Sequence, residues 1–247
     1  MLRSLVACWK LARAVAHALA GWCTIRFTFP SLTQAERNAQ VKQWSKRMLG
    51  IMGIRIVVHG TPPAQGPVLV VCNHLSWLDT TAIHAARHVR FVAKSGVRHW
   101  PLIGTLATGA GTLYIERERR RDALRVVHHM TEALGEGDLI AVFPEGTTTD
   151  GRTLLPFHAN LLQAAISSGA PVQPAALRFA DATTGETSFA PRYIDDDNLV
   201  ASLWRTLRAP PLLAIVRFGE PQAASGRERR AWALALHAEV RALMLLI

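Results

Sequence analysis

Residues 68–79 read VLVVCNHLSWLD and hold the transition that decides the fold. The run from Val68 to Cys72 is short, apolar and rich in β-branched side chains, which is typical of a strand buried on both faces of a sheet. Asn73 and His74 follow at once, and Asp79 comes five residues after the histidine. The pattern predicts a central strand that ends in a turn, with a helix beginning near residue 77.

Strands and helices alternate on both sides of this stretch. Short β-rich runs lie at 54–59, 91–93, 112–116, 139–143, 172–179 and 212–218. Helical patterns lie at 77–87, 120–134, 160–168 and 199–207, and a last helix places Trp232, Leu236, Val240 and Leu243 on one face. This alternation predicts an α/β fold with a mostly parallel central sheet flanked by helices. The loops after the carboxyl ends of such strands gather the active site.

The first 50 residues differ from the rest. They hold eight basic side chains against one acid, Glu36. Their longest charge-free window, 14–25, has twelve residues, whereas a spanning helix needs about 20. We interpret residues 1–29 as an interfacial or half-inserted helix. A second, amphipathic helix follows it. A true span with snorkelling arginines and a helical hairpin packed on the domain both stay open. The expected division is 1–52 for these membrane-docking helices and 53–247 for the α/β domain.

The composition of the chain limits the kinds of partner that it can bind. The chain has 49% hydrophobic residues, a mean hydropathy of +0.14 and a net charge of +10. Basic charge beside apolar surface suits an anionic membrane face. We expect no nucleic-acid partner, because no nucleic-acid-binding motif accompanies the charge. The three cysteines lack metal-ligand spacing, so we expect neither a disulfide framework nor a metal site.

The pair of His74 and Asp79 carries the chemistry. Acyl transfer to an alcohol needs a base to take the hydroxyl proton, and a carboxylate that orients the base. Five residues on a straight helix would leave the two side chains about 140° apart. The pairing therefore requires His74 in a turn before the helix and Asp79 in its first turns. A helix-capping histidine beside a solvated aspartate would give the same spacing without any chemistry.

Three further stretches follow predicted strands. Residues 143–148, FPEGTT, present Glu145 in a tight turn, with hydroxyl or backbone donors from Thr147. Residues 111–117, GTLYIER, deliver Arg117, whose guanidinium suits a phosphate monoester. Residues 169–175, GAPVQPA, place two prolines near a strand entry. Each stretch alone is weak evidence.

Together the four stretches resemble the glycerolipid acyltransferase family, whose motifs are N-H-x4-D, G-x-(I/L)-(F/Y)-(I/V)-x-R, F-P-E-G-(T/S) and a proline-containing block. The resemblance covers roughly residues 55–180. It implies that His74 is the base, that Asp79 is its partner and that Arg117 binds the acceptor phosphate. It also implies direct attack on a thioester, acyl-CoA or acyl carrier protein, without metal, cofactor or covalent acyl-enzyme. The expected substrate-binding residues are Asn73, Lys94, Arg117, Glu145, Gly146 and Thr147.

The expected reaction is acylation of 1-acylglycerol-3-phosphate to phosphatidic acid at the inner (cytoplasmic) membrane. We expect attachment to be peripheral or through a single N-terminal anchor, with the active site facing the cytoplasm. Phe157-His158-Ala159-Asn160 stands where the family commonly has Phe-Lys-x-Gly, which leaves the acceptor head group open. Lyso-ornithine lipid is the second acceptor to consider. Two different functions also stay open: a thioester or lipid ester hydrolase that uses Ser76, and a non-enzymatic membrane-surface protein.

Overall fold

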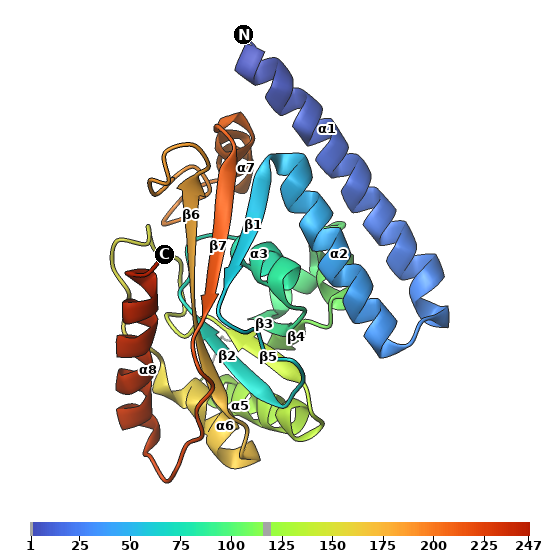
Figure 1. Cartoon of the computed structure of the whole chain (residues 1–247). Helices are drawn as coiled ribbons and strands as arrows, with labels where there is room; N and C mark the ends of the chain where they lie inside the picture. The colour runs from blue at the N-terminus through green and yellow to red at the C-terminus, as the bar shows by residue number, and fades with distance from the viewer. Residues whose placement is uncertain (1, 116–119) are drawn as a thin grey trace.

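A computed structural model describes residues 2–115 and 120–247 (Figure 1). In these residues, a seven-stranded sheet runs in the order β1-β7-β6-β2-β5-β3-β4. Its strands are β1 (Ile54–His59), β2 (Val68–Cys72), β3 (Arg90–Lys94), β4 (Leu113–Ile115), β5 (Leu139–Val142), β6 (Val172–Asp181) and β7 (Leu212–Phe218). Only the pairing of β6 with β7 is antiparallel among the described strands. The predicted mostly parallel sheet is therefore confirmed.

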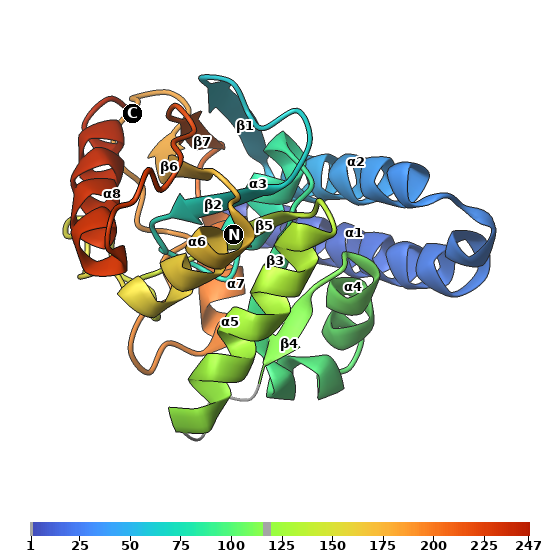
Figure 2. The same ribbon diagram turned by 90° about the horizontal axis from the view of Figure 1, so that it is seen from below.

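Helices cover both faces of the sheet (Figures 1 and 2). The helices are α1 (Leu2–Cys23), α2 (Gln34–Met52), α3 (Asp79–Ala86), α4 (Ile103–Gly109), α5 (Arg120–Gly135), α6 (Leu162–Ser168), α7 (Leu199–Arg208) and α8 (Arg229–Met244). Alternate residues of β2 enter two separate cores: Val70 packs with α2 and α3, and Leu69 packs with α5, α6 and α8. This alternation explains why the whole strand is apolar.

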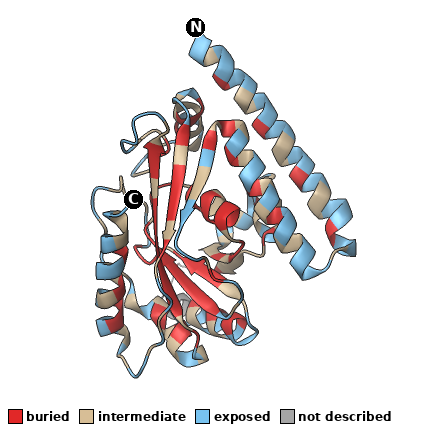
Figure 3. Ribbon diagram, viewed as in Figure 1, coloured by how far each residue is buried: buried red, intermediate tan, exposed pale blue. Residues whose placement is uncertain are grey.

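The two N-terminal helices run side by side and extend beyond the sheet (Figure 2). A short π-helix, η1 (Thr24–Thr28), and a 3₁₀ turn, η2 (Phe29–Ser31), end α1, and Thr33 with Glu36 forms a capping box at the start of α2. The buried residues of α1 are Ala7, Ala14 and Gly21, one every seventh position. Such small side chains let α1 approach its neighbours closely. The rest of α1 is largely exposed (Figure 3).

Ala7, Leu49 and Met52 belong to the same hydrophobic core as β1, β2 and α3. The helical pair thus shares its core with the sheet. None of the described helices combines the length and apolarity that crossing a bilayer requires.

Candidate active site

The end of β2 and the start of α3 bring the predicted pair together. Asp79 is the first residue of α3 and is fully buried. Its Oδ2 lies 2.7 Å from Nδ1 of His74 and accepts hydrogen bonds from the backbone N–H groups of Leu75 and Ser76, at 2.6 and 2.9 Å. Its charge also lies at the positive end of the helix. This turn supplies the geometry that a straight helix would deny.

One of the two ring nitrogens of His74, Nε2, is left available to a substrate. Its side chain is 22% exposed, and Nδ1 is occupied by Asp79. Among the described residues, Nε2 has no hydrogen-bond partner in the protein. An imidazole with Nδ1 held by a carboxylate presents Nε2 as an acceptor for a proton. This arrangement can deprotonate a hydroxyl that binds at the sheet edge.

Glu145 holds the backbone around the histidine. It follows β5 and is buried. Oε1 accepts the N–H of His74 at 2.7 Å, and Oε2 accepts the N–H of Leu155 at 2.9 Å. Burial raises the pKa of this carboxyl, although the two backbone hydrogen bonds act in the opposite direction. Glu145 therefore ties the turn that carries His74 to the chain segment around Leu155.

Comparisons with known proteins show the family of this chain. A family model described as Acyltransferase matches residues 55–178. The chain belongs to the acyltransferase family. It is 34% identical to the lyso-ornithine lipid O-acyltransferase of Pseudomonas aeruginosa over 87% of this chain and 83% of that protein. It is 38% identical to the 1-acyl-sn-glycerol-3-phosphate acyltransferase of Neisseria meningitidis over 74% of this chain and 71% of that protein.

The fold also has a solved counterpart. The crystal structure of the 1-acyl-sn-glycerophosphate (LPA) acyltransferase PlsC from Thermotoga maritima matches with a TM-score of 0.75 at 18% identity. The match covers 99% of this chain and 97% of that one. The resemblance predicted from the four motifs is thus confirmed at the level of family and fold.

The other predicted substrate-binding residues of this acyltransferase fall into three groups: exposed at the sheet edge, outside the described residues, or buried in the sheet. Lys94 ends β3 and is exposed, and Gly146 and Thr147 are exposed in the turn after β5. Because β3 and β5 are parallel neighbours, these residues share one edge of the sheet with His74. Arg117 lies outside the described residues.

Asn73 is turned into the sheet. It is buried, its Nδ2 donates to the carbonyl of Leu177 at 2.9 Å, and its Oδ1 accepts the N–H of Leu177 at 2.7 Å. This two-way bond fastens the end of β2 to β6. The polar atoms of the side chain are thus engaged by backbone and are not aimed at a substrate.

Two features of the site were not predicted. Phe143, expected only as the end of a strand, stacks its ring on His74 with 4.0 Å between centroids. Thr149 donates its backbone N–H to the carbonyl of His74 at 2.8 Å. The contact of Phe143 could have been suspected from its place at the end of a predicted strand, just before Pro144. The hydrogen bond from Thr149 to His74 depends on the path of a loop, which no local sequence pattern reveals.

Ser76 does not stand in the site as a nucleophile. It is fully buried, its Oγ donates to the carbonyl of Pro191 at 2.5 Å, and it accepts the N–H of Leu78 at 3.2 Å. Within the described residues, no three histidine, cysteine, aspartate or glutamate side chains gather as metal ligands.

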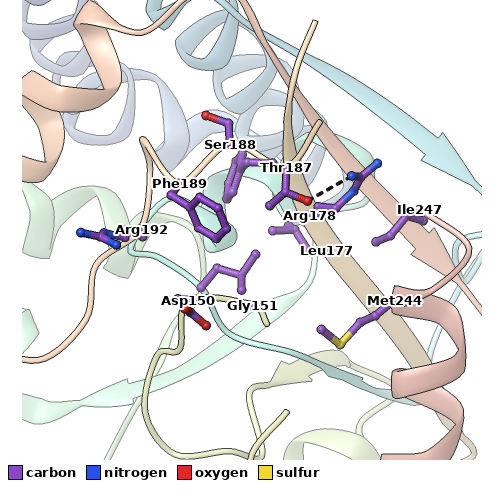
Figure 4. Close-up of a pocket in the computed structure, with 12 residues that line it drawn as sticks. Asp150, Gly151, Leu177, Arg178, Thr187, Ser188, Phe189, Arg192, Met244 and Ile247 are labelled. Atoms are coloured by element: carbon purple, nitrogen blue, oxygen red, sulfur yellow. Dashed lines mark hydrogen bonds between the residues drawn. The ribbon is translucent and has the colours of Figure 1, made fainter. Parts of the chain in front are cut away.

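A hollow lies beside Leu75, on the β6 side of the turn that carries His74 (Figure 4). Asp150 and Arg192 stand at one side of it, and Met244 and Ile247 stand at the other. Gly151 has a φ of +81° and closely approaches Leu75, so a larger residue there would push against the turn.

Proposed function

We propose that this protein transfers a fatty acyl group from acyl-CoA or acyl carrier protein to the free hydroxyl of 1-acylglycerol-3-phosphate. The product is phosphatidic acid for phospholipid synthesis. The observation that carries the proposal is the 2.7 Å contact between His74 and the buried Asp79 at the carboxyl end of the central strand. The relatives named for this acceptor, such as the Neisseria meningitidis protein, support it.

The proposed reaction has one proton relay. Nε2 of His74 takes the proton of the acceptor hydroxyl while its oxygen attacks the thioester carbonyl. Asp79 holds the tautomer and stabilises the imidazolium. When the tetrahedral intermediate collapses, the C–S bond breaks, and the proton passes from His74 to the leaving thiolate. The reaction needs no metal or cofactor, and the acyl donor is a co-substrate.

The head group of the acceptor would meet the exposed edge formed by Lys94, Gly146 and Thr147, with Arg117 as a phosphate ligand. Asn73 and Glu145 fit a supporting role better, because the protein backbone occupies their polar atoms. Lyso-ornithine lipid is the second candidate acceptor. The Pseudomonas aeruginosa relative, which matches 87% of this chain, is named for it.

A membrane surface would deliver the lipid acceptor. One helix, α1, exposes Leu2, Leu5, Trp9 and Leu19 beside basic side chains. Trp100 and Ile103 expose further apolar surface near α4, which packs against α1. These surfaces support peripheral attachment to an anionic leaflet. We propose that this leaflet belongs to the inner membrane and that the site faces the cytoplasm.

The test is an acyl-transfer assay in detergent with oleoyl-CoA and either 1-acylglycerol-3-phosphate or lyso-ornithine lipid. We expect CoA release that matches diacyl product with the first acceptor. The assay would be repeated with oleoyl-acyl carrier protein, and the faster donor identifies the co-substrate.

Three variants complete the test. His74→Ala should abolish turnover, and Asp79→Asn should lower kcat by roughly 10³- to 10⁴-fold. His128→Ala is the control, because this side chain is 70% exposed on α5. Product only from lyso-ornithine lipid would select the second acceptor. No product from any pair, or full activity in His74→Ala, would refute the proposal.

A further inference from the structure

The imidazole of His74 lies flat on the ring of Phe143. The ring centroids are 4.0 Å apart and the planes differ by 6°. We infer that Phe143 is a positioning residue for acyl transfer: its ring face fixes the plane of the His74 imidazole and stabilises the imidazolium that forms when the acceptor loses its proton. This inference rests on the proposed function, because it concerns the base of that reaction.

The close parallel stack would stabilise the imidazole once it carries a charge. A cation above the face of an aromatic ring, within about 6 Å of its centroid, is attracted by the quadrupole of the ring. The same electrostatics apply to an imidazolium. Because His74 gains its charge during attack, Phe143 would stabilise the transition state more than the ground state, and that difference is what raises a rate.

A column of aromatic rings keeps Phe143 in place. Phe91, which is buried on β3, stacks on it with 5.6 Å between centroids and 17° between planes. The imidazole of His84 meets Phe91 edge-on at 5.0 Å. Phe143 therefore contacts both a core aromatic ring and the imidazole of His74. It has little freedom to tilt away when His74 changes charge.

Asp79 and Phe143 restrain His74 in complementary ways. Asp79 holds Nδ1 at 2.7 Å and fixes the rotation of the ring. Phe143 covers one face and fixes the plane. Together they leave Nε2 pointing at the position where an acceptor hydroxyl must arrive.

The other titratable groups near His74 are preserved when Phe143 is changed. Among the described residues they include Asp79 on α3, Cys72 at the end of β2, Glu145 after β5 and, behind Phe91, His84 on α3. Burial lowers the pKa of His84 to about 3, so this side chain brings no charge near neutral pH. A change in the pH profile of a Phe143 variant would thus report the loss of the ring face.

The experiment compares Phe143→Leu, which keeps apolar bulk, with Phe143→Tyr, which keeps the ring face. Steady-state CoA release is measured from pH 5.5 to pH 9. In Phe143→Leu we expect kcat to fall roughly tenfold, with acceptor KM unchanged, and the acid limb of kcat/KM to move about half a pH unit lower. In Phe143→Tyr, both kcat and the acid limb should stay at their wild-type values. Phe218→Leu, which removes a buried ring on β7 outside this stack, is the control: it should lower the thermal midpoint and leave the limb in place.

A second readout does not depend on turnover. Histidine labelled with ¹³C at Cε1 gives NMR signals, and His74→Ala identifies the one from His74. Protons above an aromatic face resonate upfield, so this signal should move downfield in Phe143→Leu and titrate at lower pH. An unchanged limb and titration in Phe143→Leu, or equal shifts in Phe218→Leu, would overturn the role of Phe143. If the wild type releases no CoA, the proposed function fails, and the NMR titration alone decides the role of Phe143.

Discussion

Among the side chains of the site, Glu145 holds two separate segments of backbone with one carboxylate. Its two oxygens accept N–H groups from His74 and Leu155, which lie 71 and 10 residues away in sequence. Both donors belong to the backbone and cannot turn around. If an N–H or O–H group replaced either oxygen of Glu145, two hydrogen-bond donors would face each other. The hydrogen bond to His74 or to Leu155 would then be lost.

Replacing Glu145 with Gln tests this. Its amide nitrogen must oppose one of the two N–H groups, so we expect the free energy of unfolding to fall by ~1–3 kcal/mol. We expect kcat to fall as well, because the turn that carries His74 relaxes. Urea unfolding and CoA release measure the two effects. Glu132→Gln, at a position 55% exposed on α5, is the control. An unchanged unfolding midpoint in Glu145→Gln would contradict this account.

His84 links the protonation of one side chain to stability. Burial lowers its pKa from 6.5 to about 3, and its Nδ1 has no hydrogen-bond partner among the described residues. Between these two pH values the unfolded chain binds a proton that the folded protein excludes. The contribution of His84 to stability is therefore present above pH 6.5 and is lost as the pH falls toward 3. The pKa of the neighbouring His88 is also lowered by burial, so it acts in the same direction.

We expect His84→Leu to flatten this dependence. Removing one such proton lowers the slope of unfolding free energy against pH by up to about 1.4 kcal/mol per pH unit between pH 5 and pH 6. Urea unfolding at pH 5, 6, 7 and 8 gives the slope. His128→Leu removes an exposed imidazole and should leave the slope unchanged. Equal slopes in wild type and His84→Leu would show that the buried imidazole does not govern acid stability.

At the scale of elements, α1 meets α2 through a seam of small residues. A Cβ on Gly21 would lie 2.5 Å from Nε1 of Trp44. At that place Trp44 donates Nε1–H to the carbonyl of His17 at 3.1 Å, and Nε2 of His17 bonds the carbonyl of Trp44 at 3.0 Å. The close approach and the paired hydrogen bonds depend on each other.

Gly21→Leu should separate the two helices. We expect the free energy of unfolding to fall by ~1–3 kcal/mol, because a well-packed contact is overfilled. Tryptophan fluorescence and urea unfolding report the change. Gly50→Leu is the matched control, since a Cβ there meets nothing within 4 Å, and the helix gains propensity. Equal stability in the two variants would show that the seam tolerates bulk.

Local pattern was enough to predict most elements and the central pair. The apolar run at 68–72 and the five-residue spacing from His74 to Asp79 are local, and both give the observed turn. Helix α4 was missed because its sequence, IGTLATG, has little helical preference of its own. It is stabilised by tertiary contacts: Leu106 lies against Gly21, and Ile25 closely approaches Gly109. The roles of Phe143 and Glu145 likewise depend on residues far away in the chain.

For the whole molecule, charge and apolar exposure meet on α1. The net charge is +10, and Leu5 and Trp9 are 64% and 65% exposed one helical turn apart. Arg13 lies over the ring of Trp9 at 6.0 Å. Apolar side chains can enter the acyl boundary while neighbouring basic groups meet anionic head groups. The same helix packs against α2, α4 and α7, so docking would fix the orientation of the whole protein.

The double variant Leu5→Ser with Trp9→Ser tests whether this face holds the protein on a bilayer. Each lost side chain removes ~1.5 kcal/mol or more of apolar burial, so binding to phosphatidylglycerol-containing vesicles should weaken more than tenfold. Vesicle co-sedimentation at several salt concentrations measures it, and activity in detergent should persist. Leu234→Ser changes a leucine that is 74% exposed on α8 and serves as the control. If Leu234→Ser weakens binding as much as the double variant does, apolar exposure in general, rather than α1, governs attachment.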